Sequence, residues 1–93
     1  GPAQSLALMN SDIAWKAADK WAQNILKVPS DFPTRIDLLH RQAFGRSASD
    51  RELDWARGIL ADHGSDEDDA DDHGLWKEIC HTMLNRKELI YVY

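Results

Sequence analysis

The chain has a single cysteine, no long apolar run and no excess of positive charge. Because Cys80 has no second cysteine to pair with, a disulfide within the chain is excluded. No segment approaches the roughly 18 apolar residues that a membrane-spanning helix requires, so we expect no membrane span. Sixteen Asp and Glu against eleven Lys and Arg give a net charge of −5, which repels phosphate backbones. We therefore expect no nucleic acid among the partners.

The chain does contain enough apolar surface for one small core. Its 93 residues are 43% hydrophobic and include four tryptophans, and a chain of this length forms one domain. Gly1 and Pro2 match what a protease leaves after removal of an affinity tag, so we interpret residues 1–2 as a tag-cleavage scar. We expect residues 3–93 to form a single helical domain taken from a larger protein.

Apolar residues recur at helical spacing along most of the chain. This pattern predicts helices over residues 12–27, 33–44, 50–63 and 75–84, with a shorter one over residues 3–9. The last apolar residues, 89–93, should pack back on these helices. The predicted fold class is therefore all-α, a small irregular or orthogonal bundle of four to five helices.

Residues with strong capping preferences mark the ends of these helices. Pro33 suits a first helical turn, where its missing N–H costs nothing, and Gly45 suits a left-handed C-cap. Ser49 and Glu52 have the spacing of a capping box, in which each side chain accepts a hydrogen bond from the other residue's backbone. Glu52 and Glu88 are therefore interpreted as capping carboxylates, not as an acid/base pair.

Residues 65–74 (SDEDDADDHG) hold six of the sixteen acidic residues and show no apolar periodicity. We expect an acidic, solvated loop there. Calcium prefers carboxylate ligands, but the spacing does not fit an EF-hand: with Gly74 at the turn position, the twelfth position falls on Cys80, where a glutamate is needed. Weak divalent binding remains an alternative for this loop.

Cysteine and histidine do not form a recognisable cofactor or catalytic motif. Cys80, His63, His73 and His81 lack the paired short spacing of structural zinc sites, and Cys80-His81 lacks the second cysteine of a haem attachment motif. Cys80 and His81 are neighbours on a predicted helix and therefore point in different directions. We expect no catalytic residue, cofactor or metal, and a buried, unreactive Cys80.

An interaction surface is the remaining kind of site that the sequence suggests. Trp15 and Trp55 fit least well on the apolar faces of their helices, and exposed tryptophans often mark contact surfaces. Arg46 belongs to a concentration of arginines on the third and fourth helices, which could bind an anion or pair with nearby acids. Tyr91 and Tyr93 end the apolar tail. These five residues are the candidate interaction surface.

The order of several short motifs resembles that of a known family. The chain opens with Leu-Ala-Leu-Met-Asn-Ser (residues 6–11), continues with Phe-Gly-Arg (44–46) followed by Glu52-Leu53, and ends with Met-Leu-Asn-Arg-Lys-Glu-Leu-Ile-Tyr-Val (83–92). This resembles the C-terminal planctomycete-specific domain, a domain of unknown function. The residues that match the family motifs are Asn10, Ser11, Gly45, Arg46, Glu52, Asn85, Glu88, Tyr91 and Val92.

The resemblance implies a setting but no reaction. Such domains close large multidomain proteins that commonly carry a c-type cytochrome domain upstream, so the parent would be exported to the cell envelope or secreted. We therefore expect a non-catalytic accessory or interaction module whose partners are other domains of the parent or another protein. One alternative is one wall of a redox or hydrolytic enzyme, with a cleft that includes His40 and Arg46 and active groups upstream. A weak divalent-metal or anion-binding module is a further alternative.

Overall fold

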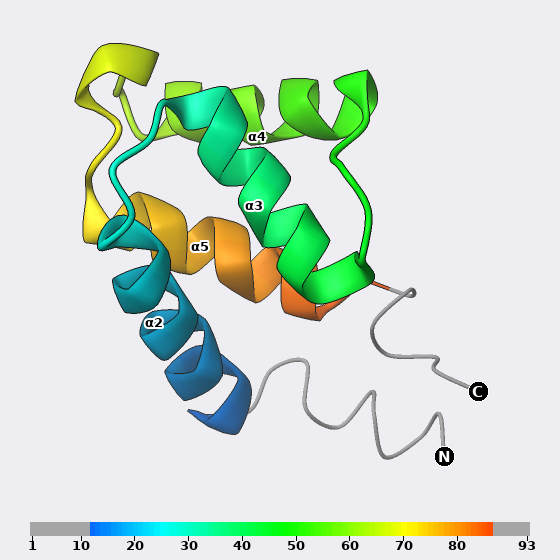
Figure 1. Ribbon diagram of the computed structural model, residues 1–93. Helices are drawn as coiled ribbons and strands as arrows, with labels where there is room; N and C mark the ends of the chain where they lie inside the picture. The colour runs from blue at the N-terminus through cyan, green and yellow to red at the C-terminus, as the bar shows by residue number, and fades with distance from the viewer. Residues whose placement is uncertain (1–11, 87–93) are drawn as a thin grey trace.

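The structure, a computed structural model, describes residues 12–86 apart from the side chain of Asp69. Within this range the chain forms four α-helices and no strand (Figure 1). The helices are α2 (Asp12–Leu26), α3 (Phe32–Phe44), α4 (Asp50–Asp62) and α5 (His73–Leu84), and a short 3₁₀ turn, η1 (Glu67–Asp69), precedes α5. The predicted all-α bundle is confirmed. The predicted helix 3–9 and the tail 89–93 lie outside the described residues.

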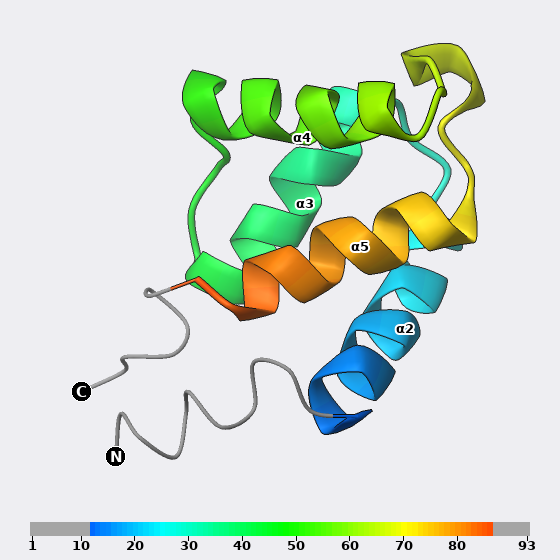
Figure 2. The ribbon, with the colours of Figure 1, turned by 180° about the vertical axis from the view of Figure 1, so that it is seen from behind.

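The helices are arranged around α5. In both views, α2 and α4 lie on opposite sides of α5, and α3 crosses α5 on one face (Figures 1 and 2). The side of α2 that faces the bundle carries small residues at helical spacing, namely Ala14, Ala18 and Ala22, followed by Ile25, and all four are buried. Small side chains let two helix backbones approach closely, which explains the extensive contact between α2 and α5.

The core is built mainly from the inner faces of α3 and α5. Trp76, the largest fully buried side chain, packs against Phe32 with ring centroids 5.3 Å apart. Ile79 and Met83 continue the buried stripe of α5, as their spacing predicts. Cys80 is fully buried on the same helix, as expected.

Gly45 and Ser49 cap α3 and α4 as predicted, and α3 has a further N-cap, Asp31, that was not predicted. Asp31 accepts a hydrogen bond from the Thr34 amide at 2.8 Å, and α3 begins at Phe32, just before the predicted Pro33. Gly45 ends α3 with φ = 70°, a left-handed conformation that glycine adopts without steric cost. The capping box of α4 is complete, with hydrogen bonds from the Glu52 amide to the Ser49 hydroxyl and from the Ser49 amide to the Glu52 carboxylate.

Residues 65–74 are more structured than the predicted solvated loop. α5 begins at His73, before the predicted Leu75, because Asp72 is the N-cap and accepts a hydrogen bond from the Leu75 amide at 3.1 Å. Ala70 is only 4% exposed, and its carbonyl accepts a hydrogen bond from the Trp76 indole at 2.6 Å. The sequence does not indicate this buried position, because a single alanine among acidic residues forms no apolar pattern.

Candidate functional site

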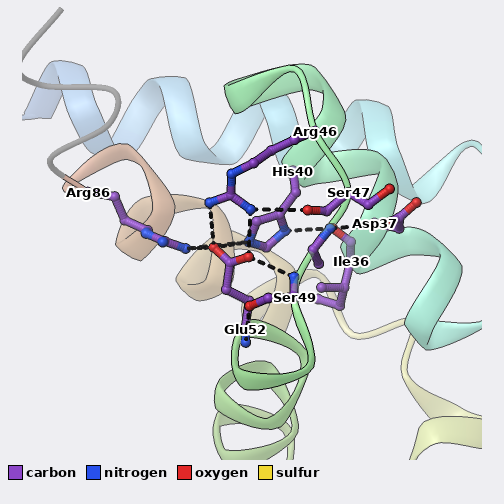
Figure 3. A network of polar contacts seen from close by, with 9 residues as sticks. Ile36, Asp37, His40, Arg46, Ser47, Ser49, Glu52 and Arg86 are labelled. Carbon is purple, nitrogen blue, oxygen red and sulfur yellow. Dashed lines mark hydrogen bonds and ion pairs between the residues drawn. The ribbon is translucent and has the colours of Figure 1, made fainter.

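Glu52 is the centre of the most connected polar cluster among the described residues. As the third residue of α4, it turns its side chain back toward the α3–α4 loop, where the Ser49 amide donates to Oε1 at 2.8 Å. Arg46 of that loop donates to both carboxylate oxygens, at 2.8 and 3.0 Å. Arg86, which follows α5, lies 2.6 Å from Oε2. Figure 3 shows both guanidinium groups directed at this one carboxylate, which we call the Glu52 cluster.

His40 completes the Glu52 cluster from α3. Its Nδ1 lies 2.8 Å from the carbonyl oxygen of Ile36 and donates a hydrogen bond to it, because a carbonyl can only accept (Figure 3). Nε2 then faces the cluster, 3.4 Å from Oε2 of Glu52 and 3.5 Å from Nη1 of Arg86. The imidazole is fully buried. It is therefore held in one orientation by groups of the domain itself.

The electrostatics of the Glu52 cluster favour a permanent carboxylate. Hydrogen bonds from Arg46, and then from the Ser49 amide and Arg86, hold the pKa of Glu52 well below its ordinary value and outweigh the opposing effect of burial. The side chain is 10% exposed and stays ionised at neutral pH. The cluster therefore joins α3, the α3–α4 loop, α4 and the end of α5 through one fixed negative charge.

Arg35 is a second buried charge, at the other end of α3. It is 4% exposed and donates to the carbonyl of Val28 at 3.0 Å, to the carbonyl of Ala70 at 3.4 Å and to the carboxylate of Asp71 at 2.9 Å. Its guanidinium also lies over the Trp76 ring, 5.2 Å from the centroid. Arg35 thus fastens the α2–α3 loop and the segment before α5 to the core.

Trp15 forms an aromatic platform between α2 and α5. Its ring stacks on the imidazole of His81, with centroids 3.5 Å apart and planes 3° apart. Lys77, one turn before His81, places its ammonium 5.8 Å from the Trp15 ring centroid. Trp15 is still 40% exposed, while His81 beneath it is 8% exposed. One face of the indole is therefore fixed by packing while much of the side chain faces solvent. We call these three residues the Trp15 surface.

Two other predicted interaction residues, Trp55 and Arg46, lie apart from this surface. Trp55 is half-buried, packs against the core and belongs to α4, on the opposite side of α5 from α2 (Figures 1 and 2). Arg46 is 40% exposed and belongs to the Glu52 cluster. Tyr91 and Tyr93 lie outside the described residues. Trp15, Trp55 and Arg46, the candidates within the described residues, therefore do not form one patch, and Arg46 and His40 of the alternative enzyme hypothesis both lie against Glu52.

Cys80 and the histidines show no arrangement of a reactive or metal-binding centre in the described range. Burial raises the pKa of the Cys80 thiol to about 12, which keeps it protonated and unreactive at neutral pH. Among residues 12–86, no group of three His, Cys, Asp or Glu side chains is placed to hold a metal ion. His63 instead contacts Glu78, and His73 pairs with Asp19 at 2.9 Å.

Sequence reasoning missed the α5 half of the Trp15 surface and the partners of Arg35. Lys77 and His81 are four residues apart and therefore share a helix face, a signal that could have placed them together. Nothing local indicates that Trp15 would stack there, since this contact depends on how α2 crosses α5. The Arg35–Asp71 pair likewise joins residues that are far apart in the sequence.

Searches of the chain against family models, curated proteins and solved structures found no match. The resemblance to the C-terminal planctomycete-specific domain therefore stays a prediction. None of the helices in the described part of the chain is long and apolar enough to cross a membrane.

Proposed function

We propose that this domain is a non-catalytic interaction module that docks against another domain of its parent protein through the Trp15 surface. The observation that carries this proposal is the 40% exposure of a tryptophan whose ring is already stacked on a buried histidine. An anchor that packing has fixed loses little side-chain entropy on binding, and tryptophan is among the residues most enriched at the energetic centres of interfaces.

The polar clusters of the domain are engaged within it, which supports a binding role over a catalytic one. His40 is fully buried, and Glu52 accepts hydrogen bonds from two arginines and a backbone amide. A general acid or base must reach the substrate and exchange a proton near neutral pH. The pKa of Glu52 lies well below neutral pH, so Glu52 stays a carboxylate and does not exchange a proton there. The alternative in which His40 and Arg46 line an enzyme cleft has no comparable support.

The family resemblance supports the choice of partner. Domains of the family that the motifs resemble close multidomain proteins, so a neighbouring domain of the same parent is the partner we choose. The parent would then act at the cell envelope or outside the cell. The Trp15 surface carries both an apolar ring and the Lys77 ammonium, so the matching surface should combine an apolar pocket with a carboxylate.

The test is calorimetric titration of this domain with the remainder of its parent protein, at low and moderate salt. We expect a dissociation constant in the micromolar range or tighter, weakened by Trp15→Ala by about 2 kcal/mol or more, because truncation of a central tryptophan commonly costs that much. Val28→Ala is the matched control, since Val28 is 42% exposed in the loop after the opposite end of α2. Circular dichroism should show that both variants stay folded.

Two results would contradict the proposal. Absence of binding by the wild-type domain would exclude docking within the parent. Equal affinity of the wild type and Trp15→Ala would place the contact elsewhere on the domain.

A further inference from the structure

A pocket of about 540 Å³ opens beside Arg35, at the end of the molecule away from the Glu52 cluster. It is lined by Leu26 at the end of α2, Pro29 and Ser30 of the following loop, Arg35 of α3, and Asp71 before α5. We call it the Arg35 pocket. Its walls combine two apolar residues with a buried guanidinium, a hydroxyl and an exposed carboxylate.

Two buried polar atoms of this pocket have no hydrogen-bond partner among the described residues, namely Nε of Arg35 and Oγ of Ser30. Buried polar atoms are nearly always paired, because leaving one unpaired costs about 1–3 kcal/mol. The walls of one pocket therefore hold two unmet hydrogen-bonding requirements. Such a pair points to a bound group that supplies acceptors.

The guanidinium shows which acceptors would fit. Of its five N–H groups, two on Nη1 donate to Ala70 and Asp71 and one on Nη2 donates to Val28. The Nε–H has no partner among the described residues, and Nη2 has one N–H beyond the one given to Val28. A guanidinium with unpaired N–H groups is suited to the oxygens of a carboxylate.

The carboxylate that already pairs with Arg35, that of Asp71, is exposed to solvent, so another carboxylate could replace it. Asp71 Oδ1 lies 2.9 Å from Nη1, but the side chain of Asp71 is 82% exposed whereas that of Arg35 is 4% exposed. The positive charge is thus buried and its counter-charge is in solvent, so the pair is a weak one. Movement of Asp71 would open the guanidinium to a second carboxylate, whose apolar part would contact Leu26 and Pro29.

We propose that the Arg35 pocket binds a carboxylate attached to a short apolar group, with Asp71 as the intramolecular competitor. Arg35 and the Ser30 hydroxyl would donate to the bound carboxylate. The same chemistry is offered by a free short-chain carboxylic acid and by the C-terminal carboxylate of a peptide ending in leucine. This site is separate from the Trp15 surface and does not depend on docking there.

The test follows the Arg35 Nε–H signal by ¹⁵N-resolved NMR during titration of the whole domain. The probes are isovalerate, its neutral analogue isovaleramide, inorganic phosphate, and a leucine-terminated tripeptide in its free-acid and amidated forms. We expect isovalerate or the free-acid peptide to shift the signal saturably with a dissociation constant of about 1–10 mM, as befits a small ligand in an open pocket. The two amides should have no effect, and the tighter of the two acids identifies the natural source.

Variants separate specific binding from general electrostatics. Asp71→Asn removes the competitor and should tighten carboxylate binding about tenfold, a modest effect for removal of one competing charge. Asp68→Asn makes the same charge change on an exposed residue of the same segment and should leave the affinity within about twofold. Ser30→Ala should weaken binding about three- to tenfold through loss of one hydrogen bond. Thermal melting of each variant checks the fold.

Three results would overturn the proposal. The first is an Arg35 signal that neither carboxylate moves at concentrations up to about 100 mM. The second is an equal response to isovalerate and isovaleramide, or a stronger response to phosphate than to either acid. The third is an equal gain in affinity from Asp71→Asn and Asp68→Asn, which would reduce the effect to net charge.

Discussion

At the scale of single residues, Glu52 shows how one side chain can serve two structural purposes. Its spacing from Ser49 predicts a helix cap, and the cap is present. The same carboxylate also binds Arg46 of the nearby α3–α4 loop. It meets Arg86 after α5 and His40 of α3 as well, and no local pattern predicts these two partners. Capping depends on neighbours in sequence, whereas the ion pairs depend on the packing of the helices.

The energetic importance of Glu52 is testable by Glu52→Gln, which keeps the shape and removes the charge. We expect a loss of about 2–3 kcal/mol in the free energy of unfolding, because two arginines lose their shared partner in a largely buried site. The control Glu67→Gln breaks the exposed pair with Arg57 and should cost less than about 1 kcal/mol. Urea denaturation measures both. Equal losses would show that the Glu52 cluster stabilises no more than a surface ion pair.

At the scale of secondary-structure elements, the sequence predicts the helices well because caps and apolar periodicity are local. Gly45 and Ser49 act as caps at the predicted ends of α3 and α4. Residues 65–74 are mostly exposed, in keeping with the predicted solvated loop, but the prediction does not include Ala70 as an anchor or Asp72 as a cap. Those contacts depend on Trp76 and Arg35 being held in the core, so a run of acidic residues cannot reveal them.

Two glycines provide a test of the helix ends with opposite expected signs. Gly45→Ala should lower stability by about 1 kcal/mol, because a residue with a β-carbon is strained at φ = 70° even where space is open. Gly58→Ala, in the interior of α4 and also in open space, should raise stability by about 0.5–1 kcal/mol. Thermal and urea unfolding would measure the difference, and a stabilised Gly45→Ala variant would contradict the C-cap assignment.

At the scale of the whole molecule, the fold class and the general position of the core follow from the sequence, but the sites do not. Trp15 and Trp55 look alike in their helical patterns, yet the first is exposed and the second half-buried. The placement of α2 against α5 determines the exposure of Trp15, and the packing of α4 against the core determines that of Trp55. Candidate sites in a small helical domain therefore depend on helix placement more than on helix identity.

The pH dependence of stability is a property of the whole domain. Hydrogen bonds lower the pKa of Glu52 and also of Asp37 and Asp31, through Arg41 and Thr34 respectively. A carboxyl whose pKa is lower in the folded state stabilises above its unfolded pKa, and this contribution is lost as pH falls through the folded pKa. We expect the melting temperature to fall progressively below about pH 4.5, near the unfolded carboxyl values.

Circular dichroism melts between pH 7 and pH 2 would test this expectation, and Glu52→Gln should flatten the acid slope. Cys80 acts in the opposite direction at high pH: its thiol pKa is raised in the fold, so its contribution is lost as pH rises toward about 12. Cys80→Ala removes the thiol and therefore the part of the loss of stability at alkaline pH that comes from Cys80. A melting temperature that does not change between pH 5 and pH 2 would show that the lowered carboxyl pKa values have little energetic weight.

The two arginines on Glu52 come from positions 46 and 86, so their meeting joins the ends of a long stretch of chain. The chain has one cysteine and so no internal disulfide, and the Glu52 carboxylate connects distant parts of the chain as a disulfide does in other small domains. Unlike a disulfide, the link forms only in the folded state, and it does not restrict the unfolded chain. We consequently expect α4 and α5 to unfold together, because separating either helix from the other breaks the contact between Glu52 and Arg86.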